Sequence, residues 1–136
     1  MDHKALAKIY RDELLENVLP FCIEKSQDKE YGGYLTCLDR RGNVYDTDKF
    51  IWLQGREVWM FSMLYNNLEK NPDWLKCAQQ GGEFLKKYGH DGNLNWYFSL
   101  TREGKPLIEP YNIFSYTFAT MAFGQLSKAT GNQEYA

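Results

Sequence analysis

The stretch FIWLQGREVWMFSMLY, Phe50 to Tyr65, decides the fold that we expect for this chain. Wound at 3.6 residues per turn, it is apolar on nearly every side, although Gln54, Arg56 and Glu57 stand near its start. A helix that lies on the surface of a protein needs a polar face, and this one hardly has one. The pattern predicts a helix from roughly Phe50 to Leu68 that other elements surround.

Three further helices are predicted, and they alternate in character. The first, about Lys4 to Lys25, is amphipathic, and so is the third, which begins at Asn71–Pro72 with an N-cap and a proline at the first helical position. The fourth, NIFSYTFATMAFGQLSKATG (112–131), is apolar or small almost all round. This alternation favours helical hairpins in two layers, with outer helices in water and inner helices enclosed. In a lone four-helix bundle, every helix would have a polar face exposed to solvent.

Two connecting segments look like small β-hairpins, and they reveal a repeat. GGYLTCLDRRGNVYD (32–46) and NWYFSLTREGKPLI (95–108) each place a glycine, Gly42 or Gly104, in a turn between β-prone runs. Sliding the chain by 62 residues superposes both hairpins and both enclosed helices without a gap. We interpret the chain as a helical-hairpin repeat. Two hairpins cannot bury two enclosed helices, so we expect further repeats to complete the layer and this chain to be truncated.

Composition excludes several classes of function. The formal net charge of −2 shows no excess of basic residues that would attract nucleic acid or an anionic membrane, so neither is an expected partner. The N-terminus is densely charged and lacks the apolar run of a signal peptide, which predicts a cytoplasmic protein. Cys22, Cys37 and Cys77 have no paired spacing and are expected to be free thiols, and we expect no zinc site.

Two segments resemble the N-acylglucosamine 2-epimerase family. DKEYGGYLTCLDRRGNVYDTDKFIWLQGREVWMFSMLYN (28–66) is similar to the family's N-terminal signature, and EPYNIFSYTFATMAFGQLSKATG (109–131) to its next inner-helix segment. The resemblance implies an all-α (α/α)6 barrel of helical hairpins with small β-hairpin connections. Residues 1–136 would be the N-terminal portion of this single domain and would supply about the first two hairpins. The family interconverts N-acetylglucosamine and N-acetylmannosamine, and its relatives act on cellobiose, mannose or other sugars. The resemblance implies a cytoplasmic isomerase, a homodimer that requires no cofactor and can respond to a nucleotide effector.

The resemblance also assigns candidate site residues. Arg56, in WLQGR, matches an arginine that the family places in its pocket, where it would bind a sugar oxygen and steady an enediolate. Trp52 lies one turn earlier on the same helix face, so its ring and the guanidinium can line one wall together. Tyr111 and Asn112, in EPYNIF, lie near the pocket mouth by resemblance. Arg56 could instead form a structural salt bridge, Trp52 could be a packing residue, and Tyr116 either packs or lines the pocket.

In the family, two histidines in later repeats act as acid and base, and His3 and His90 match neither motif. Other readings stay open. The barrel could belong to a cellobiose 2-epimerase, an aldose–ketose isomerase or a glycoside hydrolase, although Glu57 is the only acid in the enclosed part of its helix and hydrolysis uses paired carboxylates. The chain could also be a helical-repeat module that binds a partner protein without catalysis.

Overall fold

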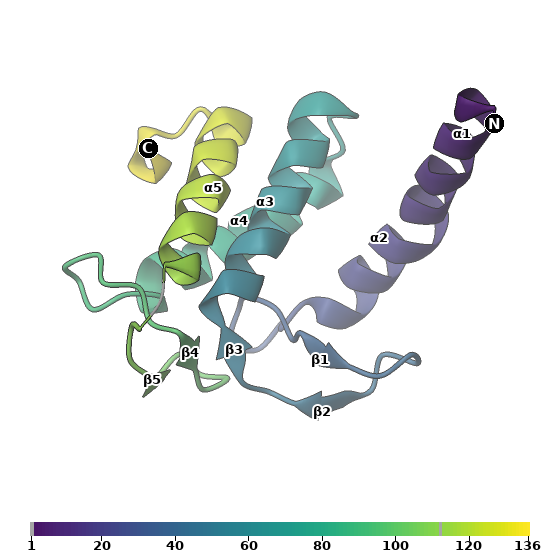
Figure 1. The fold of residues 1–136 in the computed structure, drawn as a ribbon. Helices are drawn as coiled ribbons and strands as arrows, with labels where there is room; N and C mark the ends of the chain where they lie inside the picture. The colour runs from purple at the N-terminus through teal and green to yellow at the C-terminus, as the bar shows by residue number, and fades with distance from the viewer. Residues whose placement is uncertain (1, 112) are drawn as a thin grey trace.

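The computed structural model describes residues 2–111 and 113–136, and its helices alternate with two small sheets (Figure 1). The chain begins with one continuous helical run from His3 to Ser26. This run contains α1 (His3–Glu13), the π-helical segment η1 (Leu14–Val18), α2 (Leu19–Phe21) and a second π-helical segment η2 (Cys22–Ser26). The first predicted helix is confirmed. The spacing of apolar residues does not predict the two π-helical segments.

The three long helices also begin and end close to the predicted residues. They are α3 (Ile51–Asn67), α4 (Pro72–Tyr88) and α5 (Phe114–Thr130), followed by the short 3-10 helix η3 (Gln133–Tyr135). The side chain of Asn71 accepts a hydrogen bond from the backbone N–H of Asp73 at 2.9 Å, so the predicted N-cap is confirmed. Helix α5 ends at Gly131, whose φ of +71° is the left-handed conformation that favours glycine.

Both predicted hairpins form, and they lie at the end where α3 and α5 begin (Figure 1). The first pairs β1 (Cys37–Leu38) with β2 (Val44–Asp46). The second pairs β4 (Ser99–Leu100) with β5 (Pro106–Ile108), and β4 also pairs with β3 (Lys49–Phe50), all antiparallel. The turn glycines Gly42 and Gly104 have φ of +81° and +95°. Each donates its N–H to a carbonyl three residues earlier at 3.0 Å, so the 62-residue repeat holds in three dimensions.

Helix α3 lies between the other helices and supplies much of the core. Its fully buried apolar residues are Ile51, Val58 and Phe61. Gln54 is also fully buried, yet both ends of its amide are satisfied. Its Oε1 accepts from the N–H of Tyr34 and its Nε2 donates to the carbonyl of Tyr34, each at 2.8 Å. A buried polar group costs little when it is fully hydrogen-bonded, so Gln54 ties α3 to the loop before β1.

Helix α3 is enclosed as predicted, whereas the described residues cover α5 only in part, as the expectation of further repeats implies. Helix α5 buries Ala119, Ala122 and Leu126 against α3 and α4, whereas Phe114 is 59% exposed and Met121 is 37% exposed. None of the described helices reaches both the length and the apolar character that a bilayer crossing requires.

A buried ion cluster joins the two repeats. Asp28 and Lys49 are 1% and 0% exposed, and the Lys49 Nζ lies 2.9 Å from the Asp28 carboxylate. Arg102, in the turn of the second hairpin, donates to both oxygens of the same carboxylate at 2.9 and 3.0 Å. Burial alone would raise the pKa of Asp28, but the hydrogen bonds from Arg102 and Lys49 outweigh it and lower the pKa well below its usual range.

Candidate functional site

The first half of α3 forms one wall of a cavity of about 510 Å³. Helix α3 contributes Trp52 and Arg56, and the start of α5 faces them. The remaining wall comes from the residues around the second hairpin, so that the full lining is Trp52, Arg56, Phe98, Tyr111, Phe114 and Phe118. The rings of Phe98 and Tyr111 are 4.7 Å apart and those of Trp52 and Phe118 are 6.2 Å apart. The cavity is therefore an aromatic enclosure with one cationic side chain.

Arg56 is exposed, and its surroundings are aromatic. Its guanidinium carbon lies 5.8 Å from the centre of the Trp52 ring and 5.6 Å from that of Phe118. Both contacts fall within the range at which a cation is attracted to a ring face. No ion pair to Arg56 occurs among residues 2–111 and 113–136. The alternative of a structural salt bridge thus has no acidic partner in the part of the chain that the structure describes, where α3 opens onto the cavity.

The structure brings three of the five candidate residues together. Arg56, Trp52 and Tyr111 line the same cavity. Tyr116 is half-buried, packs against the core and lines a different, shallower hollow next to Tyr111, and it is not part of the lining of the Arg56 cavity. Asn112 lies outside the described residues.

Three lining residues were missed from the sequence, namely Phe98, Phe114 and Phe118. The repeat carried a signal for two of them. Shifting Trp52 by 62 residues gives Phe114, and shifting Arg56 by the same number gives Phe118. Trp52 and Phe114 thus occupy equivalent positions on neighbouring inner helices of the repeat, and both place an aromatic ring on the cavity wall.

Glu57, the next residue of α3, lines a second cavity of about 490 Å³ between the first helical run and α3, and Arg56 lines this cavity as well. The hydroxyl of Ser26 is its hydrogen-bond partner. Burial raises the pKa of Glu57 to about 7, and the Ser26 hydroxyl opposes this rise only in part. The contact with Ser26 favours a structural role for Glu57, because it joins η2 to α3.

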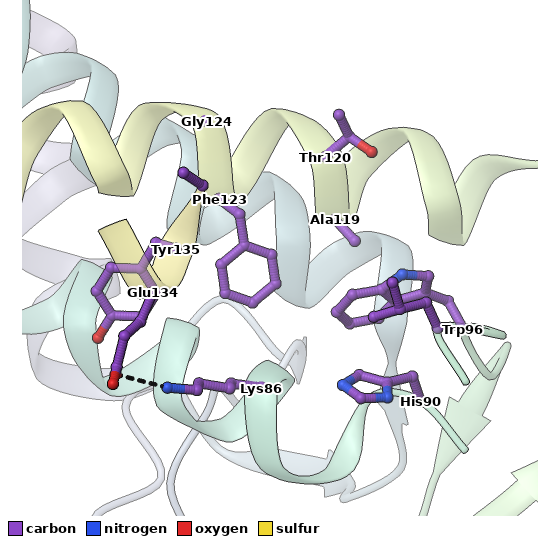
Figure 2. A pocket seen from close by; sticks show the side chains of 11 residues that line it. Lys86, His90, Trp96, Ala119, Thr120, Phe123, Gly124, Glu134 and Tyr135 are labelled. Atoms are coloured by element: carbon purple, nitrogen blue, oxygen red, sulfur yellow. Dashed lines mark hydrogen bonds and ion pairs between the residues drawn. The ribbon is translucent and has the colours of Figure 1, made fainter. Parts of the chain in front are cut away.

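Figure 2 shows a third cavity, of about 520 Å³, between α4 and α5, with Trp96 and Phe123 on its walls. The 62-residue shift carries Tyr34 onto Trp96 and Phe61 onto Phe123. The ring separations correspond, at 6.4 Å for the first pair and 5.8 Å for the second. In the first repeat α4 covers the pair, and the Tyr34 hydroxyl donates to the carbonyl of Cys77 in α4. The cavity beside Trp96 and Phe123 thus corresponds to the place that α4 fills in the first repeat. We therefore interpret it as a position for helix packing and do not assign it a small-molecule ligand.

His90 lies in the cavity of Figure 2, edge-on to Trp96, and its Nδ1 accepts from the N–H of Gly92 at 3.0 Å. His90 is not part of the lining of the Arg56 cavity. In the part of the chain that the structure describes, no group of three or more His, Cys, Asp or Glu side chains is placed to hold a metal ion. Cys22, Cys37 and Cys77 are free, as predicted, although only Cys77 is buried.

Residues 33–136 match the N-acylglucosamine 2-epimerase (GlcNAc 2-epimerase) family. The chain is 44% identical over 125 residues to the N-acylglucosamine 2-epimerase of Homo sapiens, an alignment that covers 89% of this chain and 29% of the human protein. The enzyme of the same name from Mus musculus is 43% identical and is matched over 91% of this chain and 30% of its own length. The chain thus spans about 30% of the length of these curated relatives.

The fold agrees with this match. The structure of cellobiose 2-epimerase from Bacillus thermoamylovorans B4167 superposes with a TM-score of 0.87 at 28% identity, covering 97% of this chain and 34% of that one. The predicted fold class is confirmed, because the described hairpins correspond to part of an (α/α)6 barrel. On the family match and on this superposition, the chain belongs to the N-acylglucosamine 2-epimerase family.

Proposed function

We propose that the full-length protein is a sugar 2-epimerase that interconverts N-acylglucosamine and N-acylmannosamine, and that residues 1–136 contribute one wall of its pocket. The observation that carries the proposal is the placement of Arg56. In a chain of this family, its guanidinium lies on the wall of an aromatic cavity and has no carboxylate partner among the described residues. A cation without a counter-ion is available to an oxygen of a bound sugar.

The chemistry explains why such a group is useful. Epimerisation at C2 removes a weakly acidic proton beside the carbonyl of the open-chain sugar and returns it to the opposite face. Negative charge develops on the carbonyl oxygen as the enediolate forms, and a donor held in place before the reaction lowers the barrier. Arg56 would donate to that oxygen, while Trp52 and Tyr111 would pack against the sugar. The reaction as proposed requires no cofactor, because a base, an acid and an oxyanion donor suffice.

The acid and base of the proposed reaction come from outside these residues. His90 lies in the cavity of Figure 2 and His3 begins α1, so neither lines the Arg56 cavity in the described structure. We propose that two histidines in later repeats of the protein supply both groups. By the same reasoning these 136 residues alone are expected to be inactive. A homodimer, a cytoplasmic location and a nucleotide effector remain expectations from the resemblance.

Two observations favour the N-acyl sugar over the alternatives. Identity to the N-acylglucosamine 2-epimerase of Homo sapiens is 44%, whereas identity to the superposed cellobiose 2-epimerase is 28%. Glycoside hydrolysis uses two carboxyl groups across the scissile bond. The described lining of the aromatic cavity contains none. Glu57, which lines the neighbouring cavity together with Arg56, is a single carboxyl and is hydrogen-bonded to Ser26.

Substitution of Arg56 tests the proposal in the full-length protein. We expect Arg56→Ala to lower kcat for epimerisation by about a hundredfold or more, the usual effect of removing an oxyanion donor. Proton exchange at C2 in deuterated water would follow the chemical step directly. Arg41→Ala, which removes an exposed arginine in the first hairpin, is the matched control and should retain full turnover. Unchanged epimerisation by Arg56→Ala would refute the proposal.

A further inference from the structure

The direction of the Arg56 side chain is set by two rings from two different helices. Trp52 is its neighbour one turn earlier on α3, and Phe118 comes from α5. The guanidinium carbon lies 5.8 and 5.6 Å from the two ring centres, and the rings themselves are 6.2 Å apart and inclined at 45°. The cation and the two rings thus form a triangle in which each member contacts the other two.

Contact with Phe118 depends on the close approach of α3 and α5 at Gly55. A Cβ built on Gly55 would lie 2.8 Å from both the carbonyl carbon and the carbonyl oxygen of Phe118, and 3.0 Å from its Cβ. The first two atoms belong to the backbone, so no rotation of a side chain could relieve the clash. The glycine directly before Arg56 therefore allows α5 to come near enough for the Phe118 ring to reach the guanidinium.

We propose that Phe118 and Gly55 are positioning residues for Arg56. The inference rests on the proposed function, in which Arg56 binds the sugar oxygen. An arginine on an open wall has many rotamers, and fixing one of them costs conformational entropy. The two ring faces attract the cation and restrict it before the sugar binds. Unlike a carboxylate, a ring face leaves the charge unneutralised and the N–H donors free for the developing enediolate.

A double-substitution experiment in the full-length protein separates positioning from general packing. We expect Phe118→Leu, which keeps an apolar side chain but removes the ring face, to lower kcat by about fivefold, the effect of losing one cation–π contact. Phe118→Tyr should recover most of this loss. In the Arg56→Ala background, Phe118→Leu should have no further effect on C2 proton exchange, because the group through which it acts is absent.

Gly55→Ala tests the close approach independently. It should separate α3 from α5 and lower kcat at least as much as Phe118→Leu does. The matched control is Gly82→Ala, on α4, where a Cβ would meet the Cδ2 of Leu126, an end of a flexible side chain remote from Arg56. This control should retain kcat even if its melting temperature falls.

The possible outcomes also separate this inference from the proposed function. If Arg56→Ala retains turnover, the proposed function itself fails. If Arg56→Ala loses turnover but Phe118→Leu does not, only the positioning inference is overturned. Equal loss from Phe118→Leu in the presence and absence of Arg56 would likewise overturn it, because Phe118 would then act on the fold and not through the arginine.

Discussion

The carboxyl of Glu57 lies between η2 and α3, where the hydroxyl of Ser26 is its hydrogen-bond partner. The Ser26 hydroxyl contacts a carboxyl oxygen of Glu57 and also the carbonyl oxygen of Cys22, the latter at 2.7 Å. A serine hydroxyl has a single proton to donate. Because this one proton is shared between the Glu57 carboxyl and the carbonyl of Cys22, the Ser26 hydroxyl offsets only part of the cost of burying an ionised Glu57.

The energetic consequence follows from the pKa. Burial raises the pKa of Glu57 from 4.5 to about 7. Because the folded state binds this proton more tightly than the unfolded state does, the free energy of unfolding falls as the pH rises from about 4.5 to about 7, and the loss persists above that range. Each unit between the two pKa values corresponds to about 1.4 kcal/mol, so the loss is about 3 kcal/mol. Glu57→Gln stays neutral and should raise the free energy of unfolding by about that amount at about pH 8.

Urea unfolding followed by tryptophan fluorescence at about pH 4.5 and about pH 8 measures this difference. At the lower pH the Glu57→Gln substitution should change the free energy of unfolding by less than about 1 kcal/mol, because the glutamate and the glutamine are then both neutral in the folded protein. The control is Glu69→Gln, which alters an exposed glutamate just beyond α3 and should have little effect at either pH. Destabilisation by Glu57→Gln at about pH 8 would refute the reasoning, since it would mean that the ionised carboxylate is well solvated or paired.

Three further predictions concern stability. Asp28→Asn should cost about 3–5 kcal/mol in urea unfolding because it leaves Lys49 buried without its counter-ion; recovery by an added Lys49→Met would support this account, and a loss below about 1 kcal/mol would contradict it. Gly42→Ala should lower the free energy of unfolding by about 1–2 kcal/mol, because φ at this position is +81°; calorimetry showing no loss would disprove the strain. Asn71→Ala removes the N-cap of α4 and should cost about 1 kcal/mol in the same measurement, whereas Asn71→Asp should retain the cap.

The parts of the fold that could be predicted depend on local chemistry. Asn71 followed by Pro72 defines the start of α4, and Gly131 defines the end of α5, because caps and stops act within one turn of a helix. Gly42 and Gly104 likewise locate both hairpin turns, since few other residues adopt a positive φ without strain. The 62-residue repeat then placed these local features in the correct order in space.

What could not be predicted depends on contacts between residues distant in sequence. Asp28 meets Lys49 and Arg102 across 21 and 74 residues, and no periodic pattern connects the three. In the candidate site, the pairing of Trp52 with Arg56 could be predicted because the two residues are one turn apart on α3. Phe118 lies on another helix, and its contact with Arg56 requires the helix separation that Gly55 permits.

The weak polar face of α3 has a physical explanation in these contacts. Successive residues of an α-helix are rotated by about 100°, so Gln54, Arg56 and Glu57 point in three different directions. Gln54 binds the backbone of Tyr34, Glu57 meets Ser26, and Arg56 faces the aromatic cavity. Each direction holds one polar group with its own partner, and the apolar residues between them fill the core. Helix α3 is therefore apolar on average although it carries these polar groups, because they make separate contacts and do not form one polar face toward solvent.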